Sequence, residues 1–380
     1  MSGASREAVE LIERARALLP VLRKRSPKTI ADRSVPAETI ADFQDAGFFR
    51  VLQPKRFGGL ALDFPVFADL VRELAHGCAS SAWVYAVMGE LGWVMAMFPE
   101  EGQAEVWSDP SAIGCAAVDP AGRAERGAGG FRLTGQWRFV SGSDHAQWVM
   151  VTAPADDEIR QFLVKRSELA TIDDWFVLGL IGTGSRTLCA EGLFVPASRT
   201  ITQRGMLEGN APGAAVHPDY ATCRAPRRYL TAFSLSPVIL GLAERALAIT
   251  VEGTARKIAA GQPPADLDLL QLRIGEAAAE IETARHIFEG CMAEAVARLE
   301  VRDAIGDLDI QRSRMIGAFM VRIARSAIDR ICQASGSGWL FDQSPLQVIY
   351  RDAVAGATHR AMNFDIHAKA YARGLGIGPG

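Results

Sequence analysis

Residues 131–142 read FRLTGQWRFVSG, a run of aromatic and branched side chains in which apolar and polar residues partly alternate. Such runs are typical of β-strands, and the closing Ser-Gly pair is typical of a turn. Short β-prone runs follow at residues 148–152 and 188–195, separated by glycine-rich turns. We therefore expect a β domain in the middle of the chain, over residues 111–225.

Helical spacing of apolar residues flanks this β domain on both sides. It runs from near residue 6 to about residue 107, and it returns after a connection rich in Gly, Pro and Ala over residues 203–228. The long C-terminal helices are expected at residues 229–260, 266–298, 308–335 and 345–374. Four such helices indicate a bundle. The sequence thus predicts a mainly α protein with a central β domain, in which an N-terminal helical domain covers residues 1–110 and a C-terminal four-helix bundle covers residues 226–380.

Composition and charge narrow the range of partners. The net charge of −3, with no basic stripe, argues against a nucleic-acid partner. Residues 1–20 lack the apolar core of a signal peptide, and no apolar run of membrane-spanning length stands out in the sequence, so we expect a cytoplasmic protein with no membrane partner. The six cysteines are dispersed and form no C-x-x-C pair, which favours buried reduced thiols.

Several common site motifs are missing from the sequence. No G-x-G-x-x-G is present, because the Gly-x-Gly pairs at residues 182–184 and 336–338 both lack the third glycine. There is also no phosphate-binding loop, no H-E-x-x-H, no G-x-S-x-G and no calcium loop. We therefore expect no built-in nicotinamide site and no metal site.

Four strings resemble signatures of the acyl-CoA dehydrogenase family. They are DAGFFRVLQPKRFGG (residues 45–59), GQWRFVSG (135–142), LGLIGTGSRT (178–187) and PLQVIYRD (345–352). The resemblance extends over about residues 5–375. It implies the family's fold, which is an N-terminal helical domain, a β-barrel or sandwich domain and a four-helix bundle. It also implies a flavin cofactor and a homotetramer.

Within that superfamily the chain is similar to the oxygenase components of two-component flavin-dependent monooxygenases, of the p-hydroxyphenylacetate and seco-steroid hydroxylase type. The strings that carry this likeness are WRFVSGSDHAQW (residues 137–148) and FPEEGQAEVW (98–107). The resemblance implies that a separate NAD(P)H:flavin reductase supplies reduced FMN or FAD. With O2 as co-substrate, the flavin then oxidises a small aromatic substrate through a C4a-hydroperoxide. One alternative is an acyl-CoA dehydrogenase-like FAD enzyme that desaturates an acyl thioester, and another is a non-catalytic flavin carrier.

Two residues are the catalytic candidates under this resemblance. Ser141 occupies the position that approaches the flavin N5, and the alternative is a simple turn serine. His359, expected on the last helix, occupies a position that faces the flavin, and the alternative is a surface histidine. Desaturation of a thioester needs a base. The segment around His359 has no glutamate, although Glu244, Glu276 and Glu280 are available on other bundle helices.

The remaining cofactor candidates come from three segments. They are Trp137, Phe139, Ser141 and Gly142 on the strand, Thr183 and Ser185 in the glycine-rich loop, and Gln333, Ser335 and Gly336 at the end of a bundle helix. The alternatives are that Trp137 fills the core, that the glycine-rich loop is a tight turn without a ligand, and that the last segment only terminates its helix. The resemblance assigns that last segment to the cofactor of a neighbouring subunit. Arg351 and Asp352 are expected to form a structural ion pair.

The substrate candidates lie on the helix expected over residues 80–98. Tyr85, Glu90 and Trp93 either line a largely apolar pocket or pack in the core. Phenol-hydroxylating relatives carry a histidine on this helix, and this chain has none there. Activation of a phenolate by that histidine is therefore in doubt, so an indole, a polycyclic polyketide, a thioether or an amine is considered beside a simple phenol.

Overall fold

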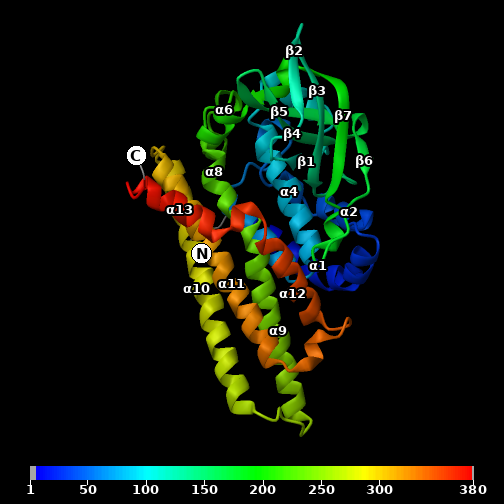
Figure 1. The fold of residues 1–380 in the computed structure, drawn as a ribbon, viewed down its shortest axis with the longest axis vertical. Coiled ribbons are helices and arrows are strands. Elements are labelled where there is room, and N and C mark those ends of the chain that lie inside the picture. Colours follow the sequence, from blue (N-terminus) through cyan, green and yellow to red (C-terminus); the bar gives the residue numbers. More distant parts are fainter. Residues whose placement is uncertain (1–5, 379–380) are drawn as a thin grey trace.

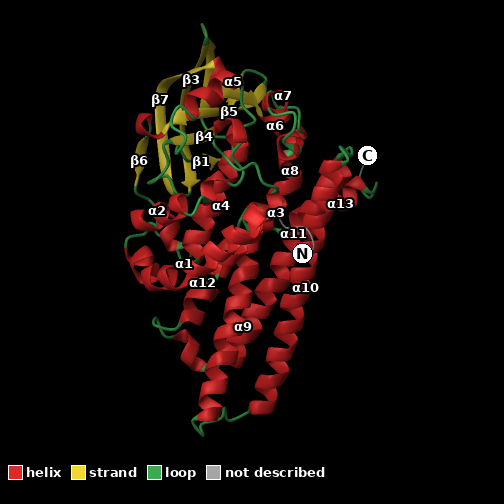
Figure 2. Ribbon diagram, turned by 180° about the vertical axis from the view of Figure 1, so that it is seen from behind, coloured by secondary structure: helices red, strands yellow, loops and turns green. Residues whose placement is uncertain are grey.

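The structure is a computed structural model that describes residues 6–378. Along its long axis the β domain occupies one end, the N-terminal helices lie against it in the middle, and the long bundle helices extend to the other end (Figure 1). The view from behind shows the same division into a strand-rich end and a helical end (Figure 2). The expected fold class, mainly α with a central β domain, is confirmed.

Five helices form the N-terminal part. They are α1 (Arg6–Ala31), α2 (Ala37–Asp45), α3 (Phe64–Ala75), α4 (Ala79–Met95) and α5 (Glu100–Val106). Helix α4 is buried along its whole length except at Val87, because α3, β1 and the bundle helix α9 surround it. A helix that is apolar on every side is expected in the centre of a protein.

Eight strands form one mixed sheet. They are β1 (Gly114–Ala117), β2 (Arg123–Gly127), β3 (Gly130–Val140), β4 (Trp148–Ala155), β5 (Glu158–Lys165), β6 (Ala170–Ile172), β7 (Arg186–Pro196) and β8 (Thr200–Thr202). Their order is β6-β7-β3-β2-β4-β5-β8, and β1 pairs in parallel with β4. The antiparallel register of β3 and β7 shifts between Trp137 and Val140. This irregularity places the turn after β3 beside the residues that precede β7.

The connection after the sheet is more structured than the sequence predicts. It contains the short helices α6 (Gln203–Glu208), α7 (Gly213–Val216) and α8 (Arg227–Leu230). The first long bundle helix consequently begins at Ser236 rather than at residue 229, with Pro237 in its first turn. Proline is well tolerated there because it lacks the N–H that would be unpaired anyway.

The bundle contains α9 (Ser236–Ala259), α10 (Leu267–Glu300), α11 (Asp307–Ala334), α12 (Pro345–Ala357) and α13 (Phe364–Gly374). The last expected helix, residues 345–374, is therefore two helices. The Asn363 side chain accepts a hydrogen bond from the Ile366 N–H and starts α13 anew. The break between the two helices contains His359.

One helical segment, Arg227–Ala259, is long and apolar enough to cross a membrane, with a mean hydropathy of 1.5. The expectation that the chain has no apolar run of this length is therefore wrong. In the structure 67% of that window is buried. Such burial is typical of the central helix of a bundle, so the segment is weak evidence for a membrane span.

Candidate active site

Three buried hydroxyl groups form a chain of hydrogen bonds where β3 ends beside the start of β7. The Ser141 and Ser185 hydroxyl oxygens are 2.7 Å apart, and the Ser185 and Thr183 hydroxyl oxygens are also 2.7 Å apart. Thr183 donates to the carbonyl oxygen of Leu180 at 2.9 Å. The structure thus brings together three residues that the sequence assigned to the cofactor site. We call this arrangement, from Ser141 through Ser185 and Thr183 to the Leu180 carbonyl, the hydroxyl relay.

The backbone around the hydroxyl relay is held in an uncommon conformation. Phe139 and Leu180 both have positive φ angles, 61° and 52°, and Gly184 has a φ of 55°. The Gly142 N–H donates to the Thr183 carbonyl oxygen at 3.0 Å and ties the two sides together. Non-glycine residues rarely adopt the left-handed region, and those that do are often found at ligand sites.

Asp352, on α12, anchors this loop from the bundle. Its Oδ1 accepts a hydrogen bond from the Leu180 N–H at 2.6 Å. Burial raises the pKa of Asp352 to about 6, although this hydrogen bond and the charge of Arg351 both lower it. The expected ion pair between Arg351 and Asp352 is wrong, because the carboxylate binds the Leu180 backbone and the Arg351 Nε has no hydrogen-bond partner.

His359 lies beyond the end of α12, not on the last helix as expected. Its Nδ1 accepts a hydrogen bond from the Ala361 N–H at 3.2 Å, so the proton of the neutral ring is on Nε2. Burial lowers the pKa of His359, although the charges of Asp119 and Glu90 raise it. We infer that His359 is a neutral imidazole at pH 7, with its Nε2–H free to donate.

The hydroxyl relay and the His359 segment meet at Gly356 of α12. A Cβ added to Gly356 would lie 3.2 Å from the Trp83 ring and 3.5 Å from the Leu180 side chain. The His359 N–H donates to the Gly356 carbonyl oxygen at 3.0 Å, and the His359 ring lies edge-on to Trp83 with 5.8 Å between centroids. Leu180 at the end of the relay and Trp83 of helix α4 therefore both pack at Gly356, and His359 contacts Gly356 and Trp83.

A buried ion pair forms the other polar part of this region. Glu90 of α4 accepts a hydrogen bond from the Arg227 guanidinium at 2.6 Å, and the two side chains are only 7% and 12% exposed. Glu90 lies seven residues after Trp83 and so shares its helix face. The sequence identified Glu90 but missed Arg227 and Trp83. No local pattern signals a pair that is 137 residues apart in the chain.

Tyr85 and Trp93 do not join this site. Tyr85 is on the opposite side of α4 from Trp83, fully buried, and its hydroxyl donates to the Phe48 carbonyl oxygen at 3.3 Å. Trp93 is also fully buried, with its ring edge-on to Phe64. Both side chains pack against core residues, although the indole N–H of Trp93 has no hydrogen-bond partner among residues 6–378. Of the two alternatives considered for these residues, packing in the core is the one observed.

Trp137 also lies in the core, whereas Phe139, the second aromatic candidate on β3, is exposed. The Trp137 ring is 1% exposed and its indole N–H donates to the Thr152 carbonyl oxygen at 2.8 Å, so Trp137 is corrected to a core residue. Phe139 instead leaves 60% of its surface exposed on a strained backbone, edge-on to Trp175. A large apolar ring held in this way fits a flat ligand that covers it. Phe139, Ser141 and Gly142 could thus hold one side of a flavin ring.

Gln333, Ser335 and Gly336 lie elsewhere in the chain. They are at the C-terminal end of α11 and just beyond it, at the end of the bundle that points away from the β domain (Figure 1). The resemblance places them at the cofactor of a neighbouring subunit, so this assignment stays a prediction.

The carboxylates considered as bases for an acyl substrate all form ion pairs with arginines. Glu244 binds Arg72 and Arg285, each at 3.1 Å, and His76 at 2.8 Å. Although burial alone would raise the pKa of Glu244, the His76 hydrogen bond and the nearby positive charges lower it to about 2. Glu276 and Glu280 both accept hydrogen bonds from Arg330. A carboxylate whose pKa is lowered as far as that of Glu244 is a poor proton acceptor.

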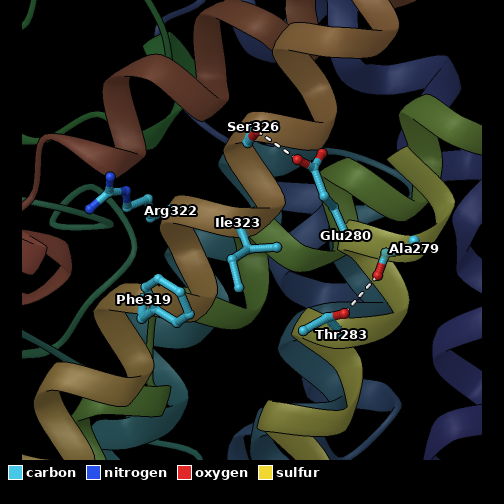
Figure 3. A pocket seen from close by; sticks show the side chains of 7 residues that line it. All are labelled: Ala279, Glu280, Thr283, Phe319, Arg322, Ile323 and Ser326. Atoms are coloured by element: carbon cyan, nitrogen blue, oxygen red, sulfur yellow. Dashed lines mark hydrogen bonds between the residues drawn. The ribbon is translucent and has the colours of Figure 1, made fainter. Parts of the chain in front are cut away.

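A separate hollow of about 370 Å³ lies between α10 and α11 (Figure 3). It is lined by Ala279, Glu280, Thr283, Phe319, Arg322, Ile323 and Ser326. Figure 3 shows the Ser326 hydroxyl directed at the Glu280 carboxylate, to which it donates at 2.9 Å. None of the residues of the hydroxyl relay lines this hollow, so it is not part of the candidate active site.

Family models for the two helical parts match the chain. The model of the N-terminal domain of acyl-CoA dehydrogenases matches residues 6–114, and the model of the C-terminal domain matches residues 233–364. Among characterised proteins, the flavin-dependent monooxygenase oxygenase subunit HsaA of Mycobacterium tuberculosis is 34% identical over 94% of this chain and 92% of its own length. The oxygenase component of the FADH2-dependent resorcinol hydroxylase of a Rhizobium species is 32% identical, over 94% of this chain and 91% of its own.

Similar chains are also found among solved structures. The 3-HSA hydroxylase of a Rhodococcus species is 30% identical and superposes with a TM-score of 0.93, covering 98% of both chains. XiaF of a Streptomyces species, solved in complex with FADH2 and glycerol, is 25% identical with a TM-score of 0.90 and covers 98% of this chain and 96% of its own.

Proposed function

Since this chain belongs to the acyl-CoA dehydrogenase superfamily and, within it, to the oxygenase components of flavin-dependent monooxygenases, we propose that it uses reduced flavin from a separate reductase to insert one oxygen atom of O2 into a small aromatic substrate. When bound, reduced flavin reacts with O2 and supplies the oxygen atom. The protein has to bind and orient the flavin, exclude water, and position the groups that donate or accept protons.

The observations that carry this proposal are the buried hydroxyl relay at the end of β3 and a neutral His359, which is linked to the relay through Leu180, Gly356 and Trp83. Ser141 and Phe139 provide a buried hydroxyl and an exposed ring on the β-domain side. His359 provides a proton at Nε2 on the bundle side. A positioned imidazole N–H can donate a proton or a hydrogen bond as negative charge develops on oxygen.

Helix α4 provides the substrate side of the proposed site. Trp83 offers an aromatic edge beside His359. The Glu90–Arg227 pair on the same helix face is internally neutralised. A site in which both charges are already paired favours a neutral substrate over an anion, because an added carboxylate would compete with Glu90 for Arg227. We therefore propose a neutral aromatic substrate.

Three further points belong to the proposal. The flavin is FMN or FAD, and nothing in the relay distinguishes them, since the three hydroxyls act at the ring that both share.

A homotetramer is supported by apolar side chains left exposed on the bundle and beyond α11, such as Leu272 at 57%, Phe341 at 62% and Phe319 at 40% in the hollow of Figure 3. Exposed apolar area of this kind is typical of subunit interfaces. A cytoplasmic location is supported by six free thiols, most of them buried.

The proposal is tested by adding the reductase separately. The purified chain alone should not oxidise NADH or NADPH. With a flavin reductase it should consume O2 and form either a hydroxylated product or hydrogen peroxide. Rapid NADH oxidation by the chain alone, or bleaching of a tightly bound yellow flavin by an acyl-CoA, would contradict it.

A further inference from the structure

Three arginine side chains beside the candidate active site have no counter-ion. They are Arg228 on α8, Arg314 on α11 and Arg360 in the turn that follows His359. Within residues 6–378 none of the three guanidinium groups makes a hydrogen bond or an ion pair. Arg312, on the same helix as Arg314, binds Glu294 at 2.8 Å. The three unpaired side chains therefore have donors to spare.

The packing of the bundle brings these three arginines together. Helix α8 and the turn after His359 both pack against α11. The Ser313 hydroxyl donates to the Tyr229 carbonyl oxygen at 2.9 Å, which ties the residue before Arg314 to the residue after Arg228. We call Arg228, Arg314 and Arg360 the arginine cluster.

The electrostatics of the arginine cluster are unfavourable without an anion. Arg314 is half-buried, whereas Arg228 and Arg360 are exposed. Burial lowers the pKa of Arg314, and the charges of Arg228 and Arg360 lower it further. A negatively charged group among the three guanidinium groups would offset both the burial and the repulsion.

The arginine cluster adjoins the candidate active site through two pairs of consecutive residues. Arg227, which binds Glu90, precedes Arg228, and His359 precedes Arg360. Consecutive residues of a helix point about 100° apart, so Arg228 does not share the direction of Arg227. Figure 1 shows α8 and α13 on one side of the molecule and β6, which pairs with the start of β7, on the other. The arginine cluster and the hydroxyl relay thus lie on opposite sides of the candidate site.

We propose that Arg228, Arg314 and Arg360 bind an anionic group, a carboxylate or a phosphate, that the substrate carries on a side chain. Guanidinium groups suit both anions because their forked N–H groups form charge-assisted hydrogen bonds with two oxygens at once. The substrate is then neutral at the aromatic ring beside the Glu90–Arg227 pair and anionic at the end remote from that ring. This inference rests on the proposed function and restricts the neutral character of the substrate to its ring.

The first test measures the dissociation constant of inorganic phosphate by calorimetry at constant ionic strength, and it needs no substrate. Arg314→Met removes the charge and keeps an apolar stem, so the dissociation constant should rise by at least about tenfold. Arg228→Gln, at an exposed position that folding does not depend on, should raise it several-fold and serves if Arg314→Met is unstable.

Arg245→Met is the matched control. Arg245 lies on α9 outside the arginine cluster, is also half-buried, and has no hydrogen bond or ion pair in the described part of the chain. This variant should bind phosphate as the wild type does. Equal phosphate affinity in the wild type and both cluster variants, or an equal loss in Arg245→Met, would overturn the inference.

The phosphate of the flavin is the other source of such an anion, and riboflavin, which lacks it, separates the two. The phosphate titration is repeated anaerobically with saturating reduced FMN or reduced riboflavin. If the substrate supplies the anion, neither flavin should change the affinity for inorganic phosphate. If FMN abolishes phosphate binding and riboflavin does not, the anion belongs to the flavin and the assignment to the substrate is overturned.

The last test uses hydroxyphenyl-alkanoates with side chains of increasing length and the corresponding amides, titrated against the reduced-flavin complex. At the length that reaches the arginine cluster, the acid should bind about tenfold more tightly than its amide, and Arg314→Met should abolish this preference. No preference for the acid at any length would overturn the assignment. If phosphate binds as expected but the protein with a flavin reductase consumes no O2, the proposed function fails and the anion site stands.

Discussion

Replacement of Asp352 by asparagine should change how stability depends on pH. The carboxyl has a pKa of about 6 in the folded protein and about 3.8 when unfolded, so the folded state binds this proton more readily. The difference of about two pKa units corresponds to roughly 3 kcal/mol. Because the folded pKa is the higher one, this stabilisation is fully present below the unfolded pKa and is lost as the pH rises through about 6.

Asparagine keeps an oxygen that can accept from the Leu180 N–H but cannot ionise. The free energy of unfolding of Asp352→Asn relative to the wild type should therefore rise by up to about 3 kcal/mol between about pH 4 and pH 8. The assay is chemical denaturation of both proteins across that range. A difference that stays constant with pH, or that falls as the pH rises, would refute the reasoning.

Glu244→Gln provides the control for this experiment. The pKa of Glu244 is lowered to about 2 in the folded protein, so its stabilisation is present above its unfolded pKa and is lost only in stronger acid. Its removal should destabilise the protein, and because Glu244 also binds His76 this destabilisation should not grow as the pH rises from about 6 to 8, in contrast to the difference caused by Asp352→Asn.

Three further substitutions address the site itself. Ser141→Ala should raise hydrogen peroxide release per NADH consumed by about three- to tenfold, because a hydrogen bond to the cofactor is lost, while the free energy of unfolding changes by less than about 1 kcal/mol. His359→Ala should slow product formation by about a hundredfold, because a positioned proton donor is lost. Since burial lowers its pKa, wild-type turnover should show no loss from His359 deprotonation above pH 7. Glu90→Gln leaves the Arg227 charge buried without its partner and should destabilise the protein by about 3 to 5 kcal/mol, whereas the double substitution with Arg227→Met should recover much of this.

Each of these expectations has an opposing result. If Ser141→Ala releases the same amount of hydrogen peroxide per NADH consumed as the wild type, the Ser141 hydroxyl does not act on the cofactor. Wild-type rates in the His359→Ala protein would show that His359 has only a structural role, as the residue that caps the turn after it. An Arg227→Met substitution that adds its own destabilisation to that of Glu90→Gln would show that the two side chains are not energetically coupled.

The sequence predicted the order of the domains and the location of the hydroxyls because both depend on local patterns. Strand alternation, helical spacing and glycine-rich turns are each contained within a few residues. Ser141, Thr183 and Ser185 stand in such turns. Their assembly into one relay depends on the register of β3 against β7, which also has a bulge.

The errors have physical causes of their own. Helix α4 is apolar on all sides, so its periodicity does not show which face meets the site, and Tyr85 was chosen where Trp83 is the residue that contacts His359. Strand alternation puts Trp137 and Phe139, two residues apart, on the same face, whereas the irregularity in β3 buries Trp137 and turns Phe139 outward. Contacts between distant segments, such as that between Leu180 and Asp352, cannot be predicted from the sequence around either residue.

The most direct test of the account follows the reaction of the reduced-flavin complex with O2 in a rapid-mixing experiment, and it needs no knowledge of the substrate. A monooxygenase component should consume O2 before the absorbance of oxidised flavin returns, so that a lag separates the two signals and shortens in Ser141→Ala. If oxidised flavin instead appears in step with O2 consumption, at the rate of free flavin in solution, the assignment of this site to oxygen insertion is contradicted.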